Sequence, residues 1–578
     1  MLRYLGPQRG RAVLLAVLLL ASIGLQLFVP QILRYFIDAA QQGAALRSLL
    51  AAAGLFLVAA LVTQLLSAAA TYVGTDVGWA ATNRMRADLV RHVLRLDMRF
   101  HKDRTPGELI ERIDGDVTAL SNFFSQFAVR VFGAALLLLG ILVLLWLENA
   151  WVGAALTAFT LLVMVVMNRA REFAVPATRL EREASAQMFG FIEERLAGLD
   201  DLRASGAGNY AMYRFRTVLR DFFVKSRRAW VGRSQLWLLT MGLFAVGYVL
   251  TLGMAVWLFG TGAISLGTAY LFFQYMTMLE APIDQITQQM QELQKAGASV
   301  IRVDELLREH SVLEEGPREL PGGPLGLDLE GVSFAYGDRP VLRAVNLRLA
   351  PGESLGLLGR TGSGKTTLTR LLLRLYDPQS GSVRLGGEDL RAVRLASLRS
   401  RVGVVTQDVQ LFSASVRDNL TFFDASIPDA RLCAVLEEVG LGYWLRSLPD
   451  GLDTPLSAGG GSLSAGQAQL LAFARVLLRD PGLVILDEPS SRLDPASEAL
   501  LQRAIDRLLA GRTAIVIAHR LETVARVDRV AVMGDGTILE EGPRAALALD
   551  PHSRFARMLR SGRDLDEAQE LELMEEKA

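Results

Sequence analysis

The sequence predicts a multidomain chain in which an all-α domain with six transmembrane helices precedes an α/β domain. Long apolar runs fill the first half, whereas short β-like runs alternate with helical runs in the second half. A phosphate-binding motif lies within the second half. The chain has 578 residues, 51% hydrophobic and only 21% charged, which favours a membrane part joined to a soluble part. Its formal net charge is zero, so we expect no nucleic-acid partner.

Six apolar runs are each long enough to cross a bilayer, which takes about 20 helical residues. Basic residues gather at the N-terminus and in the long connections that follow the second and fourth runs. Because positively charged loops stay on the cytoplasmic side, we expect an integral protein of a bacterial inner or plasma membrane, surrounded by lipid, with both termini and the α/β domain in the cytoplasm. The runs lie at 12–33, 49–73, 129–147, 150–168, 236–259 and 266–283.

The two long connections have a helix-favouring composition. Helix pairs of that length would extend tens of ångströms beyond the membrane, at about 1.5 Å per residue. We expect them to contact the soluble domain, although basic loops attracted to anionic lipid would explain their charge equally well. A charged segment with Pro and Gly then marks a boundary. The predicted divisions are a transmembrane domain at 1–310, a linker at 311–325, an α/β domain at 326–562 and an acidic tail at 563–578.

One motif of the second half matches the pattern G-x-x-x-x-G-K-[ST] of a P-loop. It follows the apolar run 354–358 and precedes the helix-like run 367–373, which is the strand–loop–helix context that the motif requires. Glycines let backbone N–H groups turn toward a phosphate, and the helix N-terminus adds partial positive charge. The lysine can then reach the β- and γ-phosphates, and the last threonine can bind Mg²⁺. The loop consists of Gly359, Arg360, Thr361, Gly362, Ser363, Gly364, Lys365 and Thr366.

A second apolar strand, 483–486, ends in the carboxylates Asp487 and Glu488. At the carboxyl edge of a parallel sheet, Asp487 can hold Mg²⁺ and Glu488 can activate water. The alternative is that both are solvated acids at a strand end without a ligand. The P-loop earlier in the chain favours the ligand-binding interpretation. Ser464 precedes the helical run 468–479 and can cap it, giving a second anion-binding helix end, although a helix cap alone is common.

These motifs together resemble the ABC exporters, a family of ATP-driven membrane transporters. The run Phe100–Val117 resembles the first cytoplasmic loop of that family, and Gly206–Tyr210 occupies the place of its second coupling helix. Ser464–Gln467 resembles the signature sequence, with Ala465 in place of its first glycine. Other family motifs are resembled by Tyr336 (adenine stacking), Gln407 (Q-loop), Asp494 (D-loop) and His519 (switch histidine).

The resemblance implies an exporter half: a transmembrane domain followed by an α/β P-loop ABC ATPase domain, which hydrolyses ATP with Mg²⁺ when two such chains dimerise. It implies catalytic roles for Lys365, Gln407, Glu488 and His519, and Mg²⁺ binding by Thr366, Gln407 and Asp487. Ala468 and Leu470 also depart from the family pattern, which often has arginine after the signature glutamine. We expect both on or beside the surface that faces the partner's ATP. Implied ATP contacts are Tyr336, Gly359–Thr366 and Thr367 in one chain, with Ser464, Ala465, Gly466, Gln467 and Asp494 supplied in trans by the other.

The partner is a second half-transporter, either an identical or a related chain, and the transported substrate is a small molecule, a lipid or a peptide. Three alternatives to export remain: uptake through the same fold, an ABC-type ATPase without transport, and a membrane regulator that binds ATP without turnover. Glu280 is the one acid of the sixth run and could tune charge preference. Side chains expected to face the substrate are Gln26, Gln64, Tyr248, Met254, Tyr270, Gln274, Tyr275, Met276 and Met278, with ordinary helix packing as the alternative.

Overall fold

The computed structural model describes residues 4, 6–457, 463–487, 495–518 and 524–561. The chain divides into two compact units. The first holds residues up to Arg95 together with Arg104–His310. The second holds Leu96–Asp103 together with the residues from Ser311 onward. A short piece of the first long connection therefore groups with the C-terminal half of the chain.

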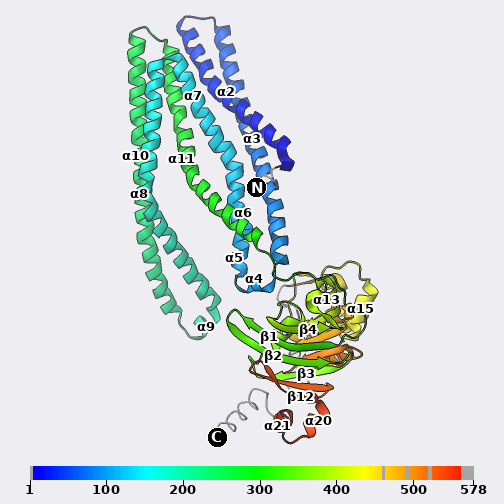
Figure 1. Ribbon diagram of the computed structural model, residues 1–578. Coiled ribbons are helices and arrows are strands. Elements are labelled where there is room, and N and C mark those ends of the chain that lie inside the picture. Colours follow the sequence, from blue (N-terminus) through cyan, green and yellow to red (C-terminus); the bar gives the residue numbers. More distant parts are fainter. Residues whose placement is uncertain (1–3, 5, 458–462, 488–494, 519–523, 562–578) are drawn as a thin grey trace. The chain divides into compact units, whose positions relative to one another are not determined.

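The first unit is a set of long helices that run alongside one another (Figure 1). Two π-helical turns, η2 and η3, interrupt the path from α5 to α7. The elements of this part of the chain, with the 3-10 turn η1 first, are η1 (Gly6–Gln8), α2 (Arg9–Gln41), α3 (Leu46–Arg95), α5 (Pro106–Ile110), η2 (Glu111–Gly115), α6 (Asp116–Gln126), η3 (Phe127–Phe132), α7 (Gly133–Glu148), α8 (Ala150–Ala197), α9 (Leu199–Ala204), α10 (Gly208–Gly260) and α11 (Leu266–Arg308).

The predicted apolar spans are confirmed for five of the six runs. The sixth run forms the first part of α11, whose Gln274 and Glu280 make it more polar than the others. Within the described residues, the helices that are long and apolar enough to cross a membrane are Gly6–Gln41, Leu46–Arg95, Arg130–Glu148, Ala150–Ala170 and Gly208–Gly260.

Local chemistry explains the tight turn between the third and fourth spans. Asn149 breaks the helix with an extended backbone, and its Oδ1 accepts hydrogen bonds from the backbone N–H groups of Trp151 (3.0 Å) and Val152 (3.2 Å). This side chain caps α8, so the chain reverses at a single residue.

The predicted helical character of the long connections is also confirmed, because α3, α8 and α10 extend from the predicted spans into them and short helices complete them. The segment Gly206–Tyr210, expected in the place of the second coupling helix, forms a turn and the start of α10. The short helix α9 (Leu199–Ala204) precedes it, and Gly206 has a φ of +63° and turns the chain into α10. A left-handed backbone at that glycine ends the helix before it.

Helices α7, α8, α10 and α11 share one hydrophobic core. Tyr275 and Met276 are fully buried in it, and so the expectation that they face a substrate was wrong. The Tyr275 hydroxyl donates to the backbone oxygen of Leu27 over 3.1 Å and is satisfied within the bundle. Packing therefore accounts for these two side chains.

The second unit contains two larger sheets and surrounding helices (Figure 1). Its helices are α4 (Met98–Lys102), α12 (Lys365–Leu372), α13 (Leu395–Arg401), α14 (Val416–Thr421), α15 (Asp429–Glu438), α16 (Gly442–Ser447), α17 (Ala465–Arg479), α18 (Pro495–Leu509), α20 (Arg544–Leu549) and α21 (Arg554–Ser561), with the 3-10 turns η4 (Leu390–Ala392) and η5 (Gly451–Asp453). Its strands are β1 (Leu327–Tyr336), β2 (Arg339–Leu349), β3 (Ser354–Gly359), β4 (Ser380–Leu385), β5 (Glu388–Asp389), β6 (Val402–Val405), β7 (Ala414–Ser415), β8 (Pro455–Leu456), β9 (Leu483–Asp487), β10 (Thr513–Ile517), β11 (Arg529–Gly534) and β12 (Thr537–Pro543).

The central sheet has six strands in the order β12-β11-β3-β10-β9-β6. All neighbouring pairs are parallel except β11 with β12. Strands β3, β9 and β10 are almost wholly buried, which explains their continuous apolar sequences. A separate antiparallel sheet has the order β2-β1-β4-β5. Its buried side chains share a hydrophobic core with one face of the central sheet. The predicted α/β character is therefore confirmed.

Candidate nucleotide-binding site

The predicted site lies at the carboxyl ends of four adjacent parallel strands. These ends carry the P-loop, the segment with Gln407, Asp487 itself and the segment that leads to His519. Gly359 ends β3, Ile517 ends β10, Asp487 ends β9 and Val405 ends β6. The register pairs Ile517 with both Leu357 and Asp487. Since parallel strands end at one edge of the sheet, segments far apart in sequence converge there.

Glycine is required at two positions of the P-loop. Gly364 has a φ of +109°, and a Cβ there would lie 2.6 Å from the Leu342 side chain. Gly359 has a φ of +151°, and a Cβ there would lie 2.4 Å from the Met533 backbone oxygen. At these two positions the loop backbone therefore passes too close to its neighbours for a side chain, as a backbone cradle for phosphate requires.

Two polar side chains of the loop have an environment suited to an anion. Ser363 is 5% exposed, and its Oγ has no hydrogen-bond partner among the described residues. The buried Lys365 ammonium donates to the backbone oxygens of Gly359 and, over 3.0 Å, of Arg360. A buried cation beside an unsatisfied hydroxyl fits a phosphate, which would accept hydrogen bonds from both.

A cavity of about 870 Å³ joins the loop to the other predicted contacts. Thr361, Gly362 and Gly364–Thr367 line one wall, and Tyr336, Gln407 and Asp487 line the others. Three oxygen-bearing side chains thus share the cavity: the Thr366 hydroxyl, the Gln407 amide and the Asp487 carboxylate. Oxygen donors of this kind are the ligands that Mg²⁺ prefers, so the residues present fit that ion.

Tyr336 belongs to an aromatic cluster at the rim of this cavity. Its ring packs edge-on against Phe334 and Tyr376, with centroids 4.9 and 5.4 Å away. Its hydroxyl accepts a hydrogen bond from Arg370 over 3.0 Å. The tyrosine is therefore held in one orientation, as an aromatic platform for a base requires.

Lys102 also lines the cavity, although sequence reasoning did not identify it. It ends α4, and its Nζ lies 3.6 Å from the centre of the Tyr336 ring, a cation–π contact. The Tyr376 hydroxyl donates to the Met98 backbone oxygen over 3.3 Å and anchors the same helix. Because Lys102 is more than 200 residues from the P-loop in sequence, no local motif could have revealed it.

The signature segment forms the predicted cap of α17. The Ser464 Oγ accepts from the Gln467 backbone N–H over 3.2 Å, and the Gln467 side chain accepts from the Ser464 N–H over 2.9 Å. This reciprocal capping box fixes the helix start. None of Ser464–Gln467 lines the P-loop cavity as the described residues define it. Leu470 is 2% exposed and lies in the hydrophobic core, so its expected place on or beside a partner-facing surface was wrong.

Arg475, in the middle of α17, is a second residue that sequence reasoning missed. It is 8% exposed and donates to the backbone oxygens of Asn419 and Gln410 over 2.7 and 2.9 Å. A third bond, over 3.0 Å, reaches the Asn419 Oδ1. Burial of the guanidinium lowers the Arg475 pKa to about 10, with a smaller contribution from the charge of Arg479. The side chain ties α17 to the segment after Gln407.

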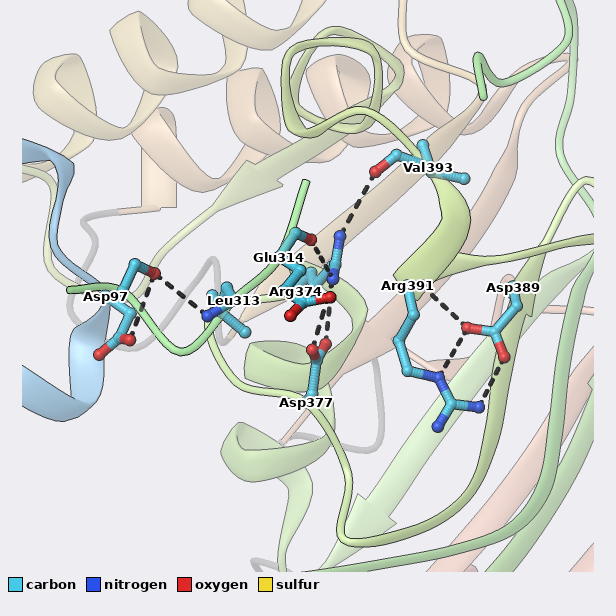
Figure 2. A network of polar contacts seen from close by, with 9 residues as sticks. Asp97, Leu313, Glu314, Arg374, Asp377, Asp389, Arg391 and Val393 are labelled. Carbon is cyan, nitrogen blue, oxygen red and sulfur yellow. Dashed lines mark hydrogen bonds and ion pairs between the residues drawn. The ribbon is translucent and has the colours of Figure 1, made fainter. Parts of the chain in front are cut away.

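The predicted linker is attached to the end of the P-loop helix. Figure 2 shows Arg374, just after α12, pointing toward the backbone near Glu314. Its guanidinium is 2% exposed, bonds the Glu314 oxygen over 2.8 Å and pairs with Asp377 over 3.0 Å. The Asp97 carboxylate accepts from the Val312 N–H over 2.7 Å in the same region. Both contacts fix the path of the chain into the second unit.

Three predicted site residues, Glu488, Asp494 and His519, lie outside the described residues, as does the whole of the acidic tail at 563–578. Their strands, β9 and β10, are described up to Asp487 and Ile517. The positions of the strand ends follow from the structure, whereas the roles of these three side chains stay predictions.

The fold and the site define a class: a helical membrane domain joined to a P-loop domain that binds a nucleoside triphosphate. Residues 13–283 match the family description "ABC transporter transmembrane region" and residues 342–491 match "ABC transporter". The chain is 31% identical to an ATP-dependent lipid A-core flippase of Dechloromonas aromatica, over 88% of this chain and 87% of that protein. The chain therefore belongs to the ABC transporter family. It is a membrane protein, and its ATPase domain binds ATP.

Other relatives differ in length and in the role that their names give. A multidrug efflux ATP-binding/permease protein of Mycobacterium tuberculosis is 31% identical over 90% of this chain, which spans only 44% of that protein. A fatty acid ABC transporter ATP-binding/permease protein of Mycobacterium bovis is 30% identical, with 80% of this chain and 74% of that protein covered. A solved structure of a bacterial Atm1-family ABC exporter with ATP bound has a TM-score of 0.80, 22% identity, and coverage of 96% and 99% of the two chains. That likeness supports the fold.

Proposed function

We propose that the chain is one half of an ATP-driven exporter that works as a dimer. The observation that carries the proposal is the cavity that joins Tyr336, the P-loop, Gln407 and Asp487 in a domain fused to apolar helices of membrane-spanning length. The lack of signature residues in the described lining of that cavity supports completion of the site by a second chain.

Each side chain of the cavity has a distinct proposed role. The Tyr336 ring stacks on the adenine, and the Lys365 ammonium exchanges its backbone partners for phosphate oxygens. Thr366, Gln407 and Asp487 would hold Mg²⁺, which when bound would supply positive charge that stabilises the negative charge developing on the phosphates. Glu488 orients and deprotonates the attacking water.

The partner chain supplies the remaining contacts in this proposal. Ser464–Gln467 and Asp494 of one chain close over the P-loop of the other, and His519 contacts the γ-phosphate within its own chain. Closure of the two ATPase domains moves the helices of the long connections and turns the membrane bundle from inward-open to outward-open. Hydrolysis resets it. The concentration of arginines in those connections supports a cytoplasmic ATPase domain in a bacterial inner membrane.

Glu488→Gln tests the catalytic proposal. We expect ATPase activity of the purified chain to fall by about 10²–10⁴-fold, the usual range for loss of a general base, while ATP stays bound and the dimer stays closed. Glu437→Gln, an exposed glutamate that does not line the cavity, is the matched control and should keep wild-type turnover. Wild-type turnover by Glu488→Gln would overturn the assignment.

A second variant tests the site formed in trans. Adding Ser464→Arg to Glu488→Gln should leave ATP bound at the P-loop but prevent the closed dimer, as followed by native mass spectrometry. Persistence of the closed dimer would contradict a role for the signature in the partner's site. If the dimer forms only with a co-expressed related chain, the partner is that chain. Transport into vesicles of both orientations separates export from uptake.

A further inference from the structure

The first unit contains a cavity of about 450 Å³ that belongs to none of the motifs above. Four stretches of helix line it: α2, α3, the continuous path through α6, η3 and α7, and α11. Of the side chains predicted to face a substrate, Gln26 lines this cavity, whereas Tyr275 and Met276 are core residues.

The charge of the lining is strongly one-sided. Arg130 is its only charged side chain, and no Asp or Glu is among the lining residues that the structure describes. Arg130 is exposed, and within the described part of the chain no hydrogen bond or ion pair is recorded for it. A guanidinium inside a membrane domain costs free energy unless an anion or water solvates its charge.

The rest of the lining combines apolar and polar surface. Leu19, Ile23 and Leu137 supply apolar contacts from α2 and α7. The hydroxyls of Thr71 and Thr75 line it as well, and they donate to backbone oxygens one turn earlier over 2.9 and 2.8 Å. These two hydroxyl protons are therefore already used, whereas Arg130 brings the positive charge of the described lining to an anionic group, beside polar side chains such as Asn122 and Gln285.

Two backbone irregularities converge on the same cavity. Arg130 lies in the π-helical turn η3, and Pro282 interrupts the hydrogen bonding of α11. A π-helical turn re-aims side chains and often occurs at functional sites, and a proline inside a helix removes one backbone donor. Straight helices could pack together without either irregularity, so their presence on two helices of one cavity favours a functional site.

The position of Arg130 along its helix suggests what it meets. It lies near the start of the predicted apolar run 129–147, at the end opposite the tight turn at Asn149. Under the proposed orientation this end is cytoplasmic, at the depth of the inner-leaflet head groups. Its apolar neighbours Leu19 and Leu137 would then lie toward acyl-chain depth.

We propose that this cavity binds an amphiphile with an anionic head group, a phosphate or a carboxylate. The head group pairs with Arg130, and the apolar tail lies along Leu19, Ile23 and Leu137. The inference rests on the proposed exporter function, since it names the class of substrate that the same chain would move. It requires no ATP for binding, however, and can fail or hold independently of the catalytic proposal.

The test uses the full-length chain in uncharged detergent without nucleotide. Trp79 lines the cavity, so its fluorescence reports occupancy, and Trp79→Phe defines the signal that comes from elsewhere. The probe is dodecyl phosphate. Inorganic phosphate and dodecyltrimethylammonium are the comparison ligands, because they remove the tail and reverse the charge respectively.

We expect saturable binding of dodecyl phosphate that Arg130→Gln weakens about tenfold or more, while Arg130→Lys weakens it less. Arg228→Gln, an exposed arginine of α10 outside the lining, is the matched control and should bind as the wild type does. Gel filtration of each variant checks that it remains folded. Equal binding of dodecyltrimethylammonium, unchanged binding by Arg130→Gln, or binding of inorganic phosphate as tight as that of dodecyl phosphate would each overturn the proposal.

Discussion

Replacement of Arg475 by methionine removes a buried cation that donates hydrogen bonds to three acceptors. The guanidinium bonds two backbone oxygens and one side-chain oxygen over 2.7–3.0 Å, and it lies over the Phe422 ring at 4.8 Å. Methionine keeps much of the apolar volume but satisfies none of these acceptors. The change therefore isolates the polar contacts from the packing.

The expected loss follows from the acceptors that stay buried. Each unsatisfied buried group costs about 1–3 kcal/mol, and relief from burying a charge offsets part of the sum. We expect a net destabilisation of about 3 kcal/mol. For a domain of this size, about 2–4 °C of melting temperature corresponds to 1 kcal/mol, so the ATPase domain should melt about 6–12 °C lower.

Thermal unfolding of the full chain in detergent, with ATPase activity measured in parallel, checks this prediction. Arg475→Lys should give an intermediate loss, because an ammonium cannot reach all three acceptors at once. Arg479→Met is the control, since that arginine contacts the same Phe422 ring at 5.2 Å but is exposed. A shift below about 2 °C for Arg475→Met would refute the reasoning that these bonds stabilise the fold.

Three further predictions concern other parts of the chain. Gly364→Ala places a Cβ at a φ of +109° and should lower ATP affinity at least about tenfold by equilibrium binding. Asp116→Asn weakens the contact of a buried carboxylate, 3% exposed, with Arg302, and should destabilise the membrane unit by about 1–3 kcal/mol in thermal unfolding; no shift would contradict a structural role. The pKa of Asp389 is lowered because Arg391 donates to it, so its contribution to stability is present above about pH 4 and is lost as the pH falls further. The melting advantage of the wild type over Asp389→Asn should accordingly shrink as the pH falls below about 4, and an advantage that grew on acidification would contradict this sign.

Adjacency in the sequence explains why parts of the site could be predicted. The P-loop lies within eight consecutive residues, and the strand before it and the helix after it are readable from composition. Ser464 and Gln467 are three residues apart, the spacing of a capping box, and the structure forms both of its bonds. The five confirmed apolar spans follow from hydropathy for a similar reason, because length and composition alone decide whether a helix can cross a bilayer.

Contacts between distant residues could not be predicted in the same way. The place of Lys102 at the Tyr336 ring depends on how α4 packs, and the burial of Arg475 depends on how α14 and α17 meet. Tyr275 and Met276 look like candidates for a substrate surface in the sequence, and only the packing of α11 shows them to be core. Arg130, by contrast, begins an apolar run where a charge is easily read as a helix boundary.

The sequence by itself determined which kinds of element the chain forms and which residues can handle phosphate, because both depend on short-range pattern. Tertiary structure decided which of those residues share a cavity. The parallel order of β3, β10, β9 and β6 brings the P-loop, Gln407 and Asp487 to one sheet edge, although up to 128 residues separate Gly359 from Asp487 in the printed sequence. The packing of four helix stretches likewise brings Arg130 into one cavity with apolar side chains of other helices. Strand order and helix packing depend on the burial of whole faces, which no local motif records.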